Sequence, residues 1–166
     1  MDADALYIID TSSLIDLQRW RPLSKHRAVW QKLDGMIRDN RLVGPEQVYE
    51  ELRAGKDALA RWAATQKKSG QLFKKNTRQH VGIAKQIIHR FSDLVDAERP
   101  GSQADPFVIA LAHYEAHNTT LAQRCFVVTN EKYTPTGRPR IPHVCASYQL
   151  PYMSIHQVYV AEGWTI

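Results

Sequence analysis

Residues 6–20, LYIIDTSSLIDLQRW, contain the pattern that decides the fold class. The run LYII at 6–9 is short and apolar, which is typical of a buried strand, and Asp10 ends it. The next residues begin with Thr and Ser, which favour helix starts, and carry Leu14, Ile15 and Leu17 at helical spacing. The sequence therefore predicts a buried strand that turns directly into a helix.

Short apolar strands and helices alternate along the rest of the chain. We expect strands at 6–9, 41–43, 125–128 and 152–155, and helices at 11–20, 26–40, 45–53, 57–67, 77–95, 106–116, 144–149 and in a last turn that ends at Trp164. This alternation predicts an α/β fold with a mostly parallel sheet. A length of 166 residues, with 43% hydrophobic and 23% charged residues, predicts a single globular domain over residues 1–166 and excludes disordered and fibrous chains.

Neither a membrane span nor a secretory signal is expected. The longest unbroken apolar run, residues 107–112, has six residues, whereas a spanning helix needs about 20. The first ten residues carry three acids and no basic residue, unlike a secretory signal. Two cysteines, Cys125 and Cys145, are too few for a disulfide scaffold. We therefore expect a cytoplasmic protein with reduced thiols and no membrane association.

The basic charge of the protein is concentrated in one segment. The formal net charge is +5, yet residues 58–92 contain eight basic residues and no acid, which leaves the rest of the chain slightly acidic. Such a segment can attract a phosphate backbone or dock an acidic partner. The alternative is a solvated helix face that maintains solubility. The eight residues are Arg61, Lys67, Lys68, Lys74, Lys75, Arg78, Lys85 and Arg90.

Two acidic residues come at or just after the ends of predicted strands. Asp10 ends the first strand, and Glu131 follows the strand at 125–128 in the run VVTNE. Ligands of open parallel sheets bind outside the carboxyl ends of the strands, so both acids are candidate site residues. The alternative is that each is only a helix cap or a turn residue.

A third acid lies on the apolar side of a predicted helix. In PEQVYEEL, Glu51 shares a helical stripe with Val48 and Leu52, so we expect it to point toward the core. A buried carboxylate needs a base, a proton or a metal beside it, and pairing with Arg53 is one alternative. Glu50 is expected to face solvent or to support a neighbouring group.

Asp105 is the fourth acid. It precedes Pro106 and the apolar run FVIALA, which predicts that it caps this helix. Capping leaves one lone pair free, so a cap can also bind a cation. Asp10, Glu51, Asp105 and Glu131 together would form an oxygen-only site, which Mg²⁺ or Mn²⁺ prefers. A divalent ion would also keep four neighbouring acids charged.

These motifs, in this order, resemble those of the PIN-domain ribonucleases, and the resemblance covers residues 6–155. Within that family the chain looks most like the toxin-type branch of toxin–antitoxin modules. The matching motifs are Asp10-Thr11-Ser12, ELRAG at 51–55, ADPFVIALA at 104–112, VTNE at 128–131, VYEEL at 48–52 and RPRIP at 138–142.

The resemblance implies a Rossmann-like α/β/α sandwich and a Mg²⁺- or Mn²⁺-dependent endoribonuclease that hydrolyses single-stranded or looped RNA. It implies that the four acids are the catalytic residues and metal ligands, that homodimers are frequent, and that an antitoxin protein is the partner. Glu131 departs from the family, in which Asp is common at this position, so contact with the metal directly or through water stays open. By analogy Ser12 would orient an acid or a phosphate, and a helix cap is its alternative role.

Basic residues on both flanks of the acids are expected to hold the RNA backbone. Hydrolysis by an activated water would leave a 5′-phosphate and a 3′-hydroxyl. Tyr133, Trp62 or Phe73 could stack on bases, or simply pack. The candidate RNA-binding residues are Ser12, Lys67, Lys68, Lys74, Lys75, Arg78, Lys132, Arg138 and Arg140.

Other functions leave different signatures. A haloacid-dehalogenase-type phosphatase needs an Asp where this chain has Ser12, which excludes it. A zinc site could combine His113 and His117 with Cys125 or Cys145. A histidine base would give 2′,3′-cyclic phosphates, and a flap-type DNA nuclease would need a helical arch. A catalytically inactive PIN-like scaffold that binds RNA or protein is the main non-enzymatic alternative.

Overall fold

The strand β1 (Leu6–Ile9) forms the centre of a five-stranded sheet. The computed structural model describes residues 4–99, 101, 103–118 and 124–165. All strand pairs in this part of the chain are parallel, in the order β3-β2-β1-β4-β5. The expected α/β class is therefore confirmed. The other strands are β2 (Leu42–Pro45), β3 (Phe73–Lys74), β4 (Cys125–Val128) and β5 (Tyr152–Met153).

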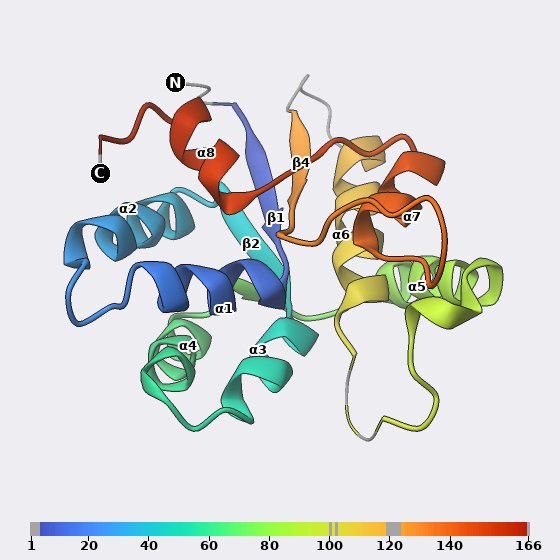
Figure 1. Cartoon of the computed structure of the whole chain (residues 1–166), viewed down its shortest axis with the longest axis horizontal. Coiled ribbons are helices and arrows are strands. Elements are labelled where there is room, and N and C mark those ends of the chain that lie inside the picture. The colour runs from blue at the N-terminus through green and yellow to red at the C-terminus, as the bar shows by residue number, and fades with distance from the viewer. Residues whose placement is uncertain (1–3, 100, 102, 119–123, 166) are drawn as a thin grey trace.

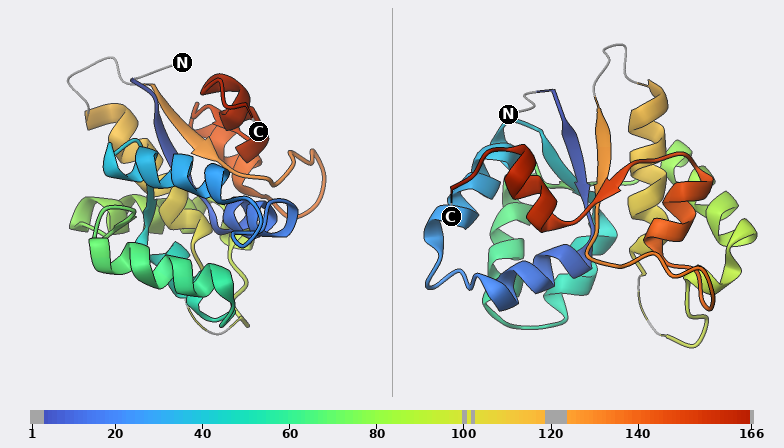
Figure 2. Two further views of the ribbon diagram at one scale, coloured as in Figure 1. Left: turned by 90° about the vertical axis from the view of Figure 1, so that its left-hand side faces the viewer. Right: turned by 45° about the horizontal axis from the view of Figure 1, so that its top comes forward.

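Helices cover both faces of the sheet, in a Rossmann-like arrangement (Figures 1 and 2). One side carries α1 (Thr11–Trp20), α2 (Arg27–Arg38), α3 (Glu46–Arg53), α4 (Ala58–Ser69) and α8 (Ile155–Ala161). The other side carries α5 (Arg78–Arg90), α6 (Asp105–Asn118) and α7 (Ile141–Ser147), with a short 3₁₀ turn, η1, at Ser92–Leu94. Because both faces are covered, every residue of β1, β2 and β4 is buried.

The topology places a crevice between β1 and β4. The chain runs from β1 outward through β2 to β3, and then crosses to β4 on the opposite side of β1. Open parallel sheets bind ligands at this kind of switch point, at the carboxyl ends of the strands. Leu6–Ile9 pair in register with Cys125–Val128, so Asp10 and Thr129 follow the paired strands at the same edge.

Several predicted element boundaries are wrong, and for three of them the contacts show the reason. The helix expected at 77–95 ends at Arg90, because Phe91 leaves helical geometry and its ring packs against His143 and Tyr148. The helix expected at 144–149 begins earlier, at Ile141, with Pro142 in its first turn. The strand expected at 152–155 stops at Met153, because Ser154 caps α8 by accepting a hydrogen bond from the Gln157 N–H.

The edge strand β3 has no counterpart in the expected elements. It consists of Phe73 and Lys74, which pair with Gly44 and Pro45. The Gly44 N–H donates to the Leu72 carbonyl at 2.8 Å. Two residues are too few to show an alternating pattern, so only this pairing identifies the strand.

In the described part of the chain, no helix is both long and apolar enough to cross a membrane.

A buried ion pair joins α8 to the start of the sheet. Glu162, 4% exposed, accepts hydrogen bonds from Arg41 at 2.6 and 3.1 Å and from the Tyr7 hydroxyl at 2.8 Å. Tyr7 lies on β1, and Arg41 directly precedes β2. Removing one partner of a buried pair leaves the other charge unpaired, which is strongly destabilising.

We predict that Glu162→Ala lowers the free energy of unfolding by about 3 kcal/mol, because Arg41 would lose its buried partner. Glu50→Ala is the matched control, since Glu50 pairs with Arg53 at the surface and such pairs contribute less than about 1 kcal/mol. Urea unfolding followed by circular dichroism measures both values. Equal losses in the two variants would contradict the prediction.

Candidate functional site

Asp10 is buried at the carboxyl end of β1 and is only 2% exposed. The Ser13 N–H donates to its Oδ1 at 2.8 Å, and the Ser12 and Thr129 hydroxyls donate to its Oδ2 at 2.7 and 2.6 Å. Burial raises the pKa of Asp10 to about 6, and these hydrogen bonds oppose the rise. Asp10 therefore caps α1 and also joins the end of β1 to the end of β4. Ser12 holds this carboxylate from within α1.

Glu51 points inward from α3, as its helical stripe predicts, and its side chain is 12% exposed. The Thr11 hydroxyl donates to its Oε1 and the Arg99 guanidinium to its Oε2, each at 2.8 Å. The alternative pairing with Arg53 is absent, because Arg53 pairs with Glu50 at 3.3 Å. Glu50 is therefore the surface member of this pair of glutamates.

Asp105 does not cap α6, which corrects the expectation from its position before Pro106. It is the first residue of the helix, and the N–H groups of Phe107 and Val108 both donate to the Ala104 carbonyl. Its half-buried carboxylate takes part in no hydrogen bond with the residues that the structure describes. Burial raises its pKa to about 8, and the negative charges of Glu131, Asp10 and Glu51 add to the rise, while Arg99 opposes it.

Glu131 follows β4 and reaches the start of α7. Its Oε2 accepts a hydrogen bond from the Ile141 N–H at 2.9 Å. Its own N–H donates to the Thr129 hydroxyl at 3.1 Å, and this same hydroxyl donates to Asp10. The position of Glu131 is thus fixed relative to Asp10 through Thr129.

Three of the four acids line one cavity, and the fourth lies behind it. Glu51, Asp105 and Glu131 line a cavity of about 220 Å³. Its other polar lining residues are Gln103, Arg99, Arg138 and Arg140. Asp10 is buried but close enough for its charge to raise the pKa of Asp105. Four separate segments therefore bring their acids together at the switch point between β1 and β4.

The donor set of this acidic cavity fits a hard divalent cation, because every acid offers carboxylate oxygens and the Asp105 carboxylate accepts no hydrogen bond from the described residues. The side chains are not preassembled, however. Among residues 4–99, 101, 103–118 and 124–165, no group of three or more His, Cys, Asp or Glu side chains is close enough to hold a metal ion. A cation here would therefore require small side-chain movements or bridging waters.

Apart from Lys132, the basic candidates divide into two groups. Arg138 and Arg140 line the acidic cavity, and Arg138 also donates to the backbone carbonyls of Asp93 and Leu94. None of the five candidates from the basic segment lines this cavity. They lie on α4, on or just after β3, and at the start of α5: Lys67, Lys68, Lys74, Lys75 and Arg78. Lys132 instead lines a neighbouring hollow.

Two aromatic candidates for base stacking are wrong. Trp62 is 9% exposed and packs edge-to-face on Trp30, and Phe73 is 5% exposed. Neither ring can reach a base in solvent. Tyr133 is 48% exposed and remains a candidate.

The histidine alternatives find little support in the geometry. Burial raises the pKa of both Cys125 and Cys145 to about 12, which disfavours the thiolate form that zinc requires. The rings of His113 and His117 lie 4.2 Å apart but form no metal group with the other described residues. None of the seven histidines, all of which the structure describes, lines the acidic cavity.

Sequence reasoning missed Arg99, Thr11 and Thr129 as site residues. Arg99 lies in the loop before α6, outside every element expected from the sequence. The two threonines belong to the runs DTS and VTNE, so their motifs were visible although their hydrogen bonds were not. Only the juxtaposition of these segments reveals what each side chain contacts.

We predict that Asp105→Asn stabilises the metal-free protein at alkaline pH. The folded pKa of Asp105 is raised, so the wild type loses stability as the pH rises from about 4, the value for an unfolded Asp, to about 8. Near pH 4 wild type and variant should have similar Tm values. Near pH 8.5 in EDTA the variant should melt higher by about 3 °C or more.

Glu98→Gln, in the exposed loop before α6, is the control and should follow the wild type at every pH. Differential scanning calorimetry across this pH range measures the Tm values. If the Tm of Asp105→Asn changes with pH as the wild-type Tm does, the pKa of Asp105 is not raised in the folded protein.

Comparison with known families gives one match. A family model described as a domain of unknown function, DUF4411, matches residues 7–166 and so includes all four acids. A comparison with curated proteins gave no match. Since the family model covers nearly the whole chain, this α/β protein with its acidic cavity belongs to the DUF4411 family.

Proposed function

We propose that this protein is a Mg²⁺- or Mn²⁺-dependent endoribonuclease of the PIN-domain type that hydrolyses single-stranded or looped RNA, and that it is the toxin of a toxin–antitoxin module. The order of the acidic motifs along the chain, which resembles that of the PIN-domain ribonucleases, supports this proposal. The observation that carries the proposal is the state of Asp105. Its carboxylate caps no helix, accepts no hydrogen bond from the described residues, and is repelled by three other acids.

A carboxylate in this state is costly unless a cation or a proton is present. With no cation, Asp105 holds a proton near neutral pH, since its pKa is about 8. Cation binding would therefore release this proton, and the two events are coupled. When bound, a divalent cation would lower the pKa of a water and offset charge on the phosphate.

The chain supplies the remaining parts of a phosphodiester site. Asp10 is held rigidly by three hydrogen bonds and would act as a fixed negative charge behind the cavity. Glu51 and Glu131 would complete the donor set from α3 and from the segment after β4. Arg138 and Arg140 line the same cavity and would bind the phosphates on either side of the scissile bond.

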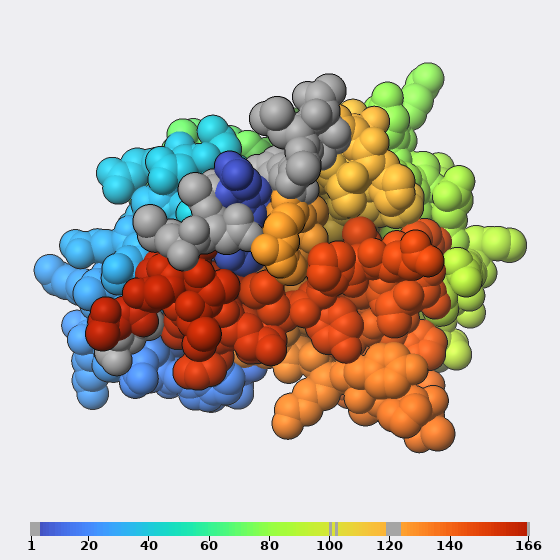
Figure 3. Space-filling model, turned by 90° about the horizontal axis from the view of Figure 1, so that it is seen from above, coloured from blue at the N-terminus to red at the C-terminus, as the bar shows by residue number. Residues whose placement is uncertain are grey.

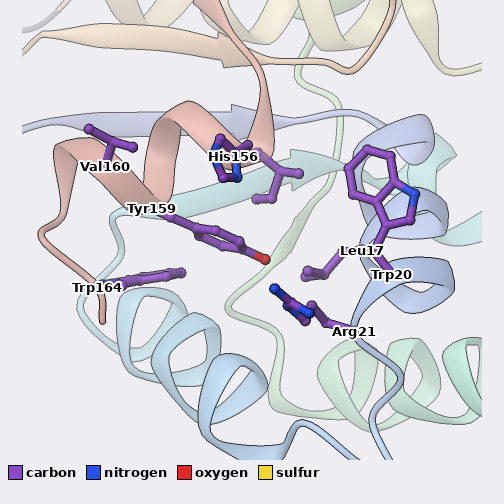
Figure 4. A pocket seen from close by; sticks show the side chains of 8 residues that line it. Leu17, Trp20, Arg21, His156, Tyr159, Val160 and Trp164 are labelled. Atoms are coloured by element: carbon purple, nitrogen blue, oxygen red, sulfur yellow. The ribbon is translucent and has the colours of Figure 1, made fainter. Parts of the chain in front are cut away.

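Protein partners belong to the same proposal, as a homodimer and as a complex with an antitoxin. A second pocket, of about 480 Å³, lies between α1 and α8 (Figure 4). Its walls include Leu17, Ile155 and Trp164, and Val160 at its side is 72% exposed. An apolar surface of this kind supports contact with another protein chain.

We predict that the purified protein cuts single-stranded RNA with Mg²⁺ or Mn²⁺, stops in EDTA and leaves 5′-phosphate ends. Asp10→Asn and Glu51→Gln should each reduce the rate by at least about a hundredfold, because each removes negative charge from the donor set. Glu50→Gln, the surface neighbour, should cut at the wild-type rate. Gel analysis of an end-labelled transcript measures the rate, and circular dichroism checks each fold.

Three outcomes would contradict this mechanism. Cyclic-phosphate ends, or full activity in EDTA, would favour a histidine base. No cleavage of transfer, ribosomal or messenger RNA with either metal would favour a catalytically inactive scaffold.

We further predict that the two groups of basic residues behave differently. Replacing Arg138 and Arg140 by Ala should raise the KM for RNA and also lower kcat, because both arginines line the acidic cavity. Replacing Lys67, Lys68, Lys74 and Lys75 by Ala should weaken binding and flatten its salt dependence while kcat is unchanged. If the four-lysine variant binds RNA as tightly as the wild type at all salt concentrations, the basic segment serves another partner or only solubility.

A further inference from the structure

A second hollow opens beside the acidic cavity. It has a volume of about 550 Å³ and is lined by residues of α1, of the segment after β4, and of β5 and α8. Glu131 lines both this hollow and the acidic cavity, so the two are adjacent. In Figure 3 the segment after β4, coloured orange, stands out from the molecule beside the red segment of residues 141–165.

Exposed aromatic rings gather in this hollow. Five large hydrophobic side chains are exposed among the described residues, and three of them line it. These are Trp20 (55% exposed), Tyr133 (48%) and Tyr152 (40%), from three segments that are far apart in sequence. Large apolar side chains that converge on one exposed site commonly mark a binding surface.

The three rings are only partly covered by the protein. Tyr133 stacks on His143 with an interplanar angle of 10° and a centroid distance of 5.6 Å, so one ring face is held while the residue stays half exposed. Neither Trp20 nor Tyr152 makes a ring contact with any other residue in the described part of the chain. Tyr152 lies on β5, one of the two edge strands of the described sheet.

The chemistry of the lining distinguishes this hollow from the pocket in Figure 4. That pocket contains the aliphatic side chains Leu17, Ile155 and Val160, which suit another protein. Among the described residues that line the hollow, none is Ala, Val, Leu, Ile or Met. Apart from its aromatic rings and His156 it is lined by polar or charged side chains, including Lys132 and Gln157. Flat aromatic faces beside hydrogen-bonding groups suit an unpaired nucleobase.

We propose that this hollow, formed around Trp20, Tyr133 and Tyr152, is a base-stacking subsite for single-stranded RNA. It holds a base next to the scissile phosphate, which lies in the acidic cavity. Lys132, which follows Glu131 in the chain and lines the hollow, contacts the intervening backbone. The inference rests on the proposed function for the nature of its ligand, and it adds a reason for preferring unpaired RNA, since a base inside a duplex has no free face to stack.

Binding under conditions that block the proposed chemistry tests the subsite. The probes are a fluorescent single-stranded oligouridylate and an abasic oligonucleotide with the same ribose–phosphate backbone. Anisotropy titrations are carried out with the wild type in EDTA, and with Asp10→Asn in Mg²⁺. We expect oligouridylate to bind at least about fivefold more tightly than the abasic strand, as expected for one stacked base.

Trp20→Ala and Tyr133→Ala should abolish this preference while leaving the salt dependence unchanged, because the phosphate contacts remain. Tyr133→Phe should keep the preference. Ile15→Ala is the matched control, since Ile15 is an exposed apolar residue of α1, 42% exposed, that lines neither pocket. Thermal melting of each variant verifies the fold.

Equal binding of the two probes by the wild type, or an unchanged preference in both alanine variants, would overturn the subsite. So would a preference lost equally in Ile15→Ala. A result in which the hollow binds a protein partner and no RNA would overturn it as well. If the wild type prefers oligouridylate to the abasic strand but cleaves no RNA with Mg²⁺ or Mn²⁺, the nuclease proposal is refuted and the subsite is supported.

Discussion

The buried carboxylate of Asp10 is the constraint on which the rest of the site depends. A carboxylate that is 2% exposed must be hydrogen-bonded, and its three donors come from the start of α1 and the end of β4. Satisfying this group fixes the two central strands at their carboxyl ends. Thr129 also fixes the backbone of Glu131, because its hydroxyl accepts a hydrogen bond from the Glu131 N–H. One buried charge therefore sets the positions of two acids that lie far apart in sequence.

The four acids differ in how many hydrogen bonds their carboxylates accept. A carboxylate with several donors has a structural role, and one without a donor is available to bind a ligand. Asp10 has three donors, Glu51 has Thr11 and Arg99, and Glu131 has the Ile141 N–H. Asp105 accepts no hydrogen bond from the described residues, and its pKa is raised to about 8. Natural folds normally avoid such a group, and they retain it where a ligand completes the balance. The acidic cavity therefore holds a carboxylate that the described residues leave uncompensated, and under the proposed function a cation would stabilise its charge.

The surface around the cavity is divided by chemistry. Arginines line the acidic cavity, aromatic and polar side chains line the adjacent hollow, and aliphatic side chains appear in the pocket between α1 and α8. Trp20 and His156 line both of the latter two, so a strand of RNA and a protein chain would meet there. Under the proposed function, a protein bound between α1 and α8 would then reach the adjacent hollow, where it would compete with the RNA.

The sequence by itself determined the α/β class, the strand-to-helix turn at Asp10 and the inward direction of Glu51, because these depend on local apolar periodicity, and a helix or strand carries its own pattern. Tertiary structure decided what the local pattern could not contain. Asp105 sits in a sequence context that favours capping, yet the Ala104 carbonyl satisfies the helix start instead. The two-residue strand β3, the pairing of Arg99 with Glu51 and the gathering of Trp20, Tyr133 and Tyr152 all join segments that are distant in sequence. Such contacts arise from the order of the strands and the packing of the layers, so they cannot be predicted from a short stretch of neighbouring residues.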